Sequence, residues 1–96
     1  MEIIFSEKAD QDLVRIYSYL ADRDLRVARS LIQSIDRKLR NLAAFPFIGR
    51  ERPHLARGIR SLVVGNYLIF YRVQSSHIGI ARIIDGRMDI DKEFPR

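Results

Sequence analysis

The chain has 96 residues with 47% hydrophobic and 30% charged side chains, a formal net charge of +5 and a pI near 10.1, which is typical of one soluble globular domain spanning residues 1–96. It has no cysteine, so disulfides and thiolate zinc sites are excluded. The N-terminus does not have the pattern of a secretory signal, and no apolar run approaches the roughly 20 residues of a membrane-spanning helix, so we expect a cytoplasmic protein with no membrane contact.

The first elements in chain order are a strand and a helix. Residues 2–5, "EIIF", predict a short strand, and a helix is expected from Ser6 to about Asp22. The Ser6 hydroxyl can cap the first turn of this helix. Its apolar stripe comprises Ala9, Leu13, Ile16, Tyr17 and Leu20.

A second amphipathic helix follows after the short link "DRDL". Asp24 is a suitable N-cap, and Pro46 ends the helix because proline has no amide hydrogen and restricts the preceding residue. The apolar face of this helix contains Ala28, Leu31, Ile32, Ile35, Leu39, Leu42 and Ala43. The short link predicts an antiparallel helical hairpin that packs its apolar side on another layer.

Residues 46–58 predict an irregular loop, because two prolines and two glycines interrupt them. Three antiparallel strands are expected at 59–64, 67–73 and 78–84, with Gly65-Asn66 forming a turn that needs positive φ. The predicted fold is α+β with the order β-α-α-β-β-β. Its N-terminal helical hairpin covers one face of a mainly antiparallel sheet, and the other face is left open.

Positive charge is concentrated in the middle of the chain. Residues 25–87 hold 12 basic and 3 acidic residues, which is a net +9, whereas residues 1–24 carry −3 and residues 88–96 carry −1. Such a field attracts nucleic acid or an acidic protein. The alternative is that the charge only keeps the protein soluble.

The ordered motifs of the chain resemble the ParE branch of the RelE/ParE superfamily of toxin–antitoxin toxins. They are "A..DL..I..Y" from Ala9 to Tyr19, "P..G" at Pro46 and Gly49, "RP.L..G.RSL.VGNY.I.YRV" from Arg52 to Val73, and "R...GRMD" from Arg82 to Asp89. The resemblance covers nearly the whole chain and implies the compact α+β fold predicted above.

The resemblance also implies a toxin that a cognate ParD-like antitoxin neutralises in a hetero-oligomeric complex. ParE-like members are associated with inhibition of DNA gyrase, and RelE-like members cleave mRNA in the ribosome. Three functions therefore stay open. The chain is a gyrase inhibitor, a ribosome-dependent endoribonuclease, or a non-toxic module that binds the antitoxin.

A nuclease needs acid–base groups and cations placed around the phosphate. The candidate bases are Glu51, His54, His77 and Asp85, and no spacing forces either histidine against a carboxylate. Many relatives carry His in place of Asp85, and RelE-like nucleases tend to carry Tyr or His near the C-terminus, where this chain has Phe94. We therefore predict no catalytic residues, no metal and no cofactor, and favour a protein inhibitor over an enzyme.

Partner binding is the function expected of the remaining candidates. These are Tyr17, Tyr19, Phe47, Arg57, Arg60, Arg72, Arg82, Arg87 and Asp89. Guanidinium groups would bind carboxylates in the acidic and apolar C-terminal segment of the antitoxin, and the aromatic rings would receive its apolar side chains. If Arg60, Arg72 and Arg82 share a face of the sheet, that face is the basic one opposite the helices.

Each of these residues also has a structural interpretation. The arginine stems can cover apolar surface while their heads point to water. Tyr17 lies on the apolar stripe and suits core packing. The "GRMD" segment is equally suited to a local clasp between Arg87 and Asp89 that fixes the tail, or to a surface that the target reads.

Overall fold

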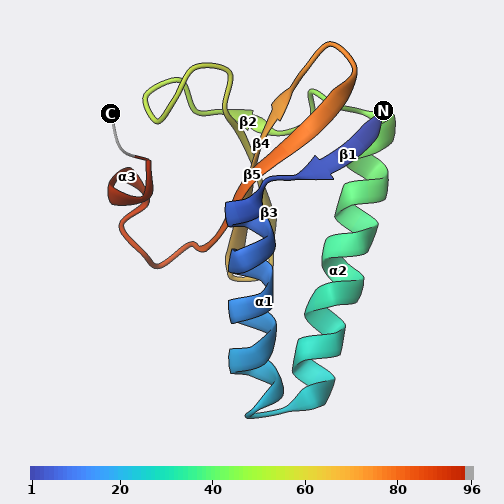
Figure 1. Cartoon of the computed structure of the whole chain (residues 1–96), viewed down its shortest axis with the longest axis vertical. Coiled ribbons are helices and arrows are strands. Elements are labelled where there is room, and N and C mark those ends of the chain that lie inside the picture. The colour runs from blue at the N-terminus through green and yellow to red at the C-terminus, as the bar shows by residue number, and fades with distance from the viewer. Residues whose placement is uncertain (95–96) are drawn as a thin grey trace.

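The computed structural model describes residues 1–94 and has two long helices on one side of a five-stranded sheet and a short helix on the other (Figure 1). Within those residues the elements are β1 (Glu2–Phe5), α1 (Glu7–Ala21), α2 (Leu25–Ala44), β2 (Arg50–Glu51), β3 (Arg60–Val64), β4 (Tyr67–Val73), β5 (His77–Asp85) and α3 (Ile90–Glu93). The predicted α+β fold, with a helical hairpin packed on a mainly antiparallel sheet, is confirmed. None of the helices in this part of the chain has the length and apolar content needed to cross a membrane.

The sheet has the order β1-β5-β4-β3-β2. β1 runs parallel to β5, and the other neighbouring strands are antiparallel. The predicted hairpin from Arg60 to Val73 is confirmed, with Val64 paired to Tyr67 across the turn. Only Gly65 of its two turn residues has a positive φ, of 58°. A side chain at that position would be strained, because L-residues rarely adopt this conformation.

Both helix starts follow from short polar side chains. Ser6 Oγ accepts a hydrogen bond from the Ala9 amide at 3.0 Å, and Asp24 Oδ1 accepts one from the Arg26 amide at 2.9 Å. These bonds satisfy amides that have no partner within the first helical turn. The antiparallel pair α1–α2 lays its apolar side on the sheet, as predicted (Figure 1).

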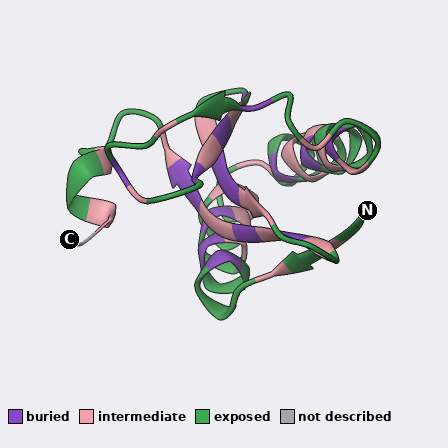
Figure 2. Ribbon diagram, turned by 90° about the horizontal axis from the view of Figure 1, so that it is seen from above, coloured by how far each residue is buried: buried purple, intermediate pink, exposed green. Residues whose placement is uncertain are grey.

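The main core lies between the helices and the sheet. Its buried members are Ala9, Ile16, Ile35, Leu42, Val64, Ile69, Tyr71, Ile78, Ile80 and Ile83. Tyr17 is half-buried and belongs to neither apolar cluster of the described residues. Buried segments therefore run along the centre of the sheet and the inner side of both helices (Figure 2).

The second face of the sheet is covered, so the prediction of an open face is wrong. Leu55, Ile59, Phe70 and Ile84 form a second buried cluster there, and Phe94 packs edge-on against Phe70 with ring centroids 4.9 Å apart. The physical reason lies in β4, "YLIFYRV", which is apolar on both faces, so both faces must be shielded from water. The loop after β2 and the segment around α3 supply that shield.

The strand β2 and the helix α3 were not predicted. Both are short, with two and four residues, and neither shows a hydrophobic period in sequence. β2 forms because Arg50 and Glu51 pair with Ser61 and Arg60 at the edge of the sheet. α3 is held against the second cluster by Phe94, which directly follows the helix and packs on Phe70.

Candidate functional site

A buried carboxylate on α1 joins the helices to the last strand. β1 ends at Phe5, which is opposite Ile80, so the amide of Ile83 further along β5 has no strand partner. Asp12, only 2% exposed, takes that place and accepts a hydrogen bond from the Ile83 amide at 3.0 Å. Arg82 completes the pair, with its Nε 2.7 Å from Asp12 Oδ2 and its Nη2 3.0 Å from Asp12 Oδ1.

The charges around Asp12 are mutually compensated. Burial raises the pKa of Asp12, but hydrogen bonds from Arg82, Ile83 and Arg15 outweigh it, and the net pKa lies below the ordinary value. The hydrogen bond to Asp12 raises the pKa of Arg82. Arg82 also bonds Glu93 of α3 at 3.3 Å, so one guanidinium joins α1, β5 and α3. This arrangement gives Arg82 a structural role.

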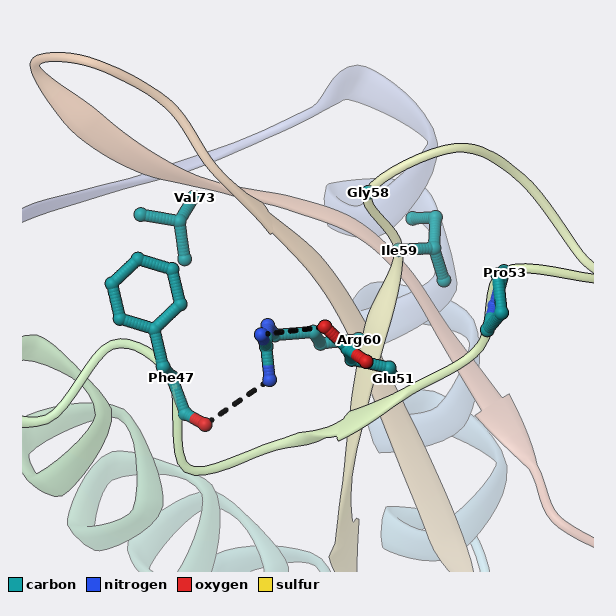
Figure 3. A pocket seen from close by; sticks show the side chains of 7 residues that line it. All are labelled: Phe47, Glu51, Pro53, Gly58, Ile59, Arg60 and Val73. Atoms are coloured by element: carbon teal, nitrogen blue, oxygen red, sulfur yellow. Dashed lines mark hydrogen bonds and ion pairs between the residues drawn. The ribbon is translucent and has the colours of Figure 1, made fainter.

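Arg60 organises the loop that follows α2 (Figure 3). Its Nη1 donates to the carbonyls of Phe47 at 3.1 Å and Gly49 at 2.8 Å, and its Nη2 bonds Glu51 at 3.0 Å. The guanidinium carbon lies 5.1 Å from the centre of the Phe47 ring, which is 65% exposed. Phe47, Glu51 and Arg60 help to line a cavity of about 280 Å³, in which the Phe47 ring and the Glu51 carboxylate are both accessible.

The buried Tyr71 of β4 also holds this loop, through two hydrogen bonds of its hydroxyl to the segment of residues 46–49. Its hydroxyl donates to the Pro46 carbonyl at 2.8 Å and accepts from the Gly49 amide at 2.8 Å. A Cβ at Gly49 would lie 2.4 Å from that hydroxyl oxygen, so the close approach requires glycine. The Pro46–Gly49 motif is therefore a structural seat for the loop.

The clasp between Arg87 and Asp89, one of the two interpretations of the "GRMD" segment, is wrong, because Arg87 pairs with Asp85 instead. The two side chains meet at 2.6 Å, and Asp85 also accepts from the Arg87 amide. These bonds lower the pKa of Asp85 to about 2. Asp89 is exposed at the start of α3, where its side chain makes no capping bond. The physical reason is that an aspartate readily accepts from the backbone amide two residues further on, and this turn brings Asp85 to the Arg87 side chain.

A groove runs between the helical hairpin and the β3–β4 hairpin. It has a volume of about 620 Å³ and is lined by Tyr19, Leu20, Asp24, Arg26, Val27, Ser30, Leu31, Ser34, Val64, Gly65, Asn66, Tyr67 and Arg87. Tyr19 is 55% exposed, and the Arg23 guanidinium lies 3.5 Å above its ring. The lining combines apolar side chains with Arg26 and Arg87, which we call the rim arginines and which pair with Asp24 and Asp85. The groove therefore suits a ligand that carries both apolar side chains and carboxylates.

A smaller cavity of about 250 Å³ adjoins this groove. Tyr19, Tyr67 and Arg87 line both hollows, and Arg82 and Glu93 lie in the smaller one. Burial first, and then the Asp85 carboxylate, raise the pKa of Tyr67, which keeps its hydroxyl protonated at neutral pH. Sequence reasoning did not single out Tyr67 or Val27 as groove residues, because their neighbours are distant in sequence.

The predicted partner-binding residues are divided among separate places. Arg60 stands opposite Tyr71 and therefore on the helix side of the sheet, whereas Arg82 stands opposite Phe70 on the second face. Arg72 shares the second face with Arg82, and its Nε donates to the Arg57 carbonyl at 2.9 Å. The three arginines do not form one basic face. Tyr17 lines none of the hollows described above, whereas Tyr19 and Arg87 meet in the groove.

Three of the candidate acid–base residues interact with side chains outside the candidate set. Glu51 is bonded to Arg60, Asp85 is bonded to Arg87, and the His77 ring lies 3.1 Å from Ser76 Oγ. Among residues 1–94, no group of three or more histidine and carboxylate side chains is placed to hold a metal ion.

Comparisons with known proteins agree with the motifs and the fold. A family model described as the ParE toxin of the type II toxin–antitoxin system parDE matches residues 3–90. Toxin ParE3 of Caulobacter vibrioides is 30% identical over 89 residues, which span 92% of this chain and 89% of that protein. A solved structure of the chromosomal ParDE TA system from P. aeruginosa superposes with a TM-score of 0.74 at 26% identity, covering 88% of this chain and 95% of that one.

Proposed function

Because the chain belongs to the ParE toxin family of type II toxin–antitoxin systems, we propose that it inhibits DNA gyrase by binding it and that a ParD-like antitoxin holds it inactive in the cytoplasm. The observation that carries the choice of an inhibitor over a nuclease is the state of the candidate acid–base carboxylates. Glu51 is bonded to Arg60 and Asp85 is bonded to Arg87, so neither carboxylate is available to take a proton from a ribose hydroxyl.

Three of the arginines support the same choice. Stabilising a cleaved phosphate requires guanidinium groups that are free to meet it. Arg60 and Arg82 bond carbonyls and carboxylates of their own chain, and Arg87 bonds Asp85, whereas Arg72 bonds only the Arg57 carbonyl. The donors of Arg60, Arg82 and Arg87 hold the loop, α3 and the turn after β5 in place. These three residues therefore contribute to partner binding indirectly, by holding the segments that form the surface.

We place the antitoxin in the groove beside Tyr19. A segment with apolar side chains can cover Val27 and Leu31, and its carboxylates can compete with Asp24 for Arg26, whose side chain is 92% exposed. Val27 is 49% exposed, so covering it removes apolar surface from water. The rim arginines orient the segment and speed its association, and the apolar lining contributes most of the affinity.

The test is a gyrase supercoiling assay with the purified chain, with and without its antitoxin. We expect inhibition or accumulation of cleaved DNA, relieved by the antitoxin. Cuts in ribosome-bound mRNA, with supercoiling unaffected, would replace the proposal by the endoribonuclease function. Normal growth on strong expression without antitoxin would leave only a non-toxic module that binds the antitoxin.

A further inference from the structure

Seven arginines of residues 1–94 have no carboxylate partner, and four of them lie on the strands β2 and β4 or in the loop between β2 and β3. Six arginines form ion pairs, namely Arg15, Arg26, Arg40, Arg60, Arg82 and Arg87. Arg50, Arg52, Arg57 and Arg72 form none with any carboxylate of residues 1–94, and we call these four residues the basic face. Arg23, Arg29 and Arg37 form no ion pair either, but they lie on α2 or in the link before it. The basic face is the candidate for binding an anion from outside because its four charges belong to the sheet and one covering loop.

Strand register places these residues on the second side of the sheet. Arg50 stands opposite Ser61, and Ser61 stands opposite Phe70, whose ring lies in the second cluster. Arg72 is two residues beyond Phe70 on β4 and therefore projects from the same face. Arg52 reaches Ser61 as well, and Arg57 lies in the loop that covers this side.

The one acidic residue of this stretch points elsewhere. Glu51 pairs with Arg60 on the helix side of the sheet, at 3.0 Å. Its charge is therefore compensated away from the basic face. The alternation of side chains along β2 separates Arg50 from Glu51. The second side also carries Asp91 and Glu93 of α3, and Glu93 is paired with Arg82.

Two of the guanidinium groups are held in position for a ligand. Arg52 donates its Nε to Ser61 Oγ at 3.0 Å, and Arg72 donates its Nε to the Arg57 carbonyl at 2.9 Å. Each bond uses the inner nitrogen and leaves the two outer nitrogens with no bond to the rest of residues 1–94. An outward fork of this kind matches the oxygens of a phosphate group, and its orientation is already fixed before binding.

We propose that the basic face binds the sugar–phosphate backbone of duplex DNA. A protein partner would need a cluster of large aromatic anchors, whereas the exposed apolar side chains that register places on this face, Val63 and Ile4, are single aliphatic residues on different strands. A single strand would need exposed rings on which bases stack, and the aromatic residues Phe70 and Tyr71 beneath this surface are fully buried. Charge without stacking is the pattern of backbone contact.

The choice of duplex DNA rests on the proposed function, because gyrase presents this polymer to any protein bound to it. The basic face then adds a DNA contact to the contact with the enzyme. With about four phosphates neutralised, affinity for duplex should fall roughly 100-fold between 50 and 200 mM salt, since the slope is about −0.9 per phosphate.

The test measures binding of a fluorescein-labelled duplex to the full-length chain by anisotropy, with a single-stranded RNA of the same sequence as the second probe. The variant Arg50→Ala/Arg57→Ala removes two exposed charges that make no side-chain bond within residues 1–94, so the fold is unaffected. Arg29→Ala/Lys38→Ala on α2 is the matched control, because it removes two exposed charges from the opposite side.

The expected result is duplex binding that the first variant weakens at least tenfold, with the salt slope reduced by about 2, and that the control changes less than twofold. Equal losses in both variants, tighter binding of the RNA, or no duplex binding at 50 mM salt would each overturn the proposal. A loss of gyrase inhibition in the first variant without any duplex binding would assign the basic face to a protein surface instead.

Running the supercoiling assay on the same proteins separates this inference from the proposed function. Gyrase inhibition by a chain that does not bind duplex DNA would refute DNA binding by the basic face and leave the inhibitor function unaffected. Duplex binding by a chain that leaves gyrase unaffected would refute the inhibitor function and support the basic face as a DNA-binding surface.

Discussion

Asp12 should be the most sensitive single position for folding, and Asp12→Ala measures its contribution. The substitution leaves Arg82, whose side chain is 12% exposed, without its main partner, and it leaves the Ile83 amide unbonded. Breaking a buried ion pair from one side costs about 3–5 kcal/mol, and the remaining bond to Glu93 places the expected loss near the lower end, at about 3 kcal/mol.

The assay is thermal and urea unfolding followed by circular dichroism. A loss of about 3 kcal/mol corresponds to a fall in Tm of about 12–24 °C for a domain of this size. Asp36→Ala is the matched control, because it removes the carboxylate of the exposed pair with Arg40 and should cost about 0.3–0.5 kcal/mol. If Asp12→Ala stayed within 1 kcal/mol of the wild type, Asp12 would not be the anchor of α1 on β5.

The remaining predictions concern stability and antitoxin binding. The folded pKa of Asp12 lies below its unfolded value, so its contribution to stability is present above about pH 4 and is lost as pH falls through the folded pKa. Asp12→Asn should therefore make the free energy of unfolding depend less on pH between about pH 2 and 6, as measured by urea titrations. Tyr71→Phe should cost about 1–3 kcal/mol in unfolding experiments, because the buried Gly49 amide loses its acceptor; an unchanged midpoint would contradict this. Tyr19→Ala should weaken antitoxin binding in calorimetry at least tenfold, whereas Tyr17→Ala, which lies outside the groove, should change it little. Antitoxin association should also slow as salt rises, and a rate that stays flat from low to high salt would refute steering by the rim arginines.

The sequence predicted the local structure well where a single chemical signal decides it. Ser6 and Asp24 cap the two helices, and Gly65 occupies the turn at a φ that favours glycine. The covered second face could have been predicted from β4, since a strand that is apolar on both faces needs two covering layers. The prediction missed this because the loop after β2 and the tail show no hydrophobic period.

The candidate site was less predictable because it depends on long-range register. Asp12 appeared in sequence as one polar position of a helix, and its partners on β5 lie 70 and 71 residues away. The face of the sheet from which the Arg60 side chain projects depends on the strand register, which places Tyr71 of β4 opposite Arg60. Pairing of Arg87 with Asp85 was one of two short-range possibilities that composition alone could not separate. The basic face also depends on the strand register, which places Arg50 and Arg72 on the same side of the sheet.

The most direct test of the central claim is a titration of gyrase with the purified chain, in which supercoiling is measured at several gyrase concentrations and preincubation times. A binding inhibitor should act stoichiometrically, so the chain concentration that halves activity should rise with gyrase concentration and should not fall with longer incubation. Unchanged supercoiling at a large excess of chain, or progressive loss of activity at a small fraction of the gyrase concentration, would contradict inhibition by binding.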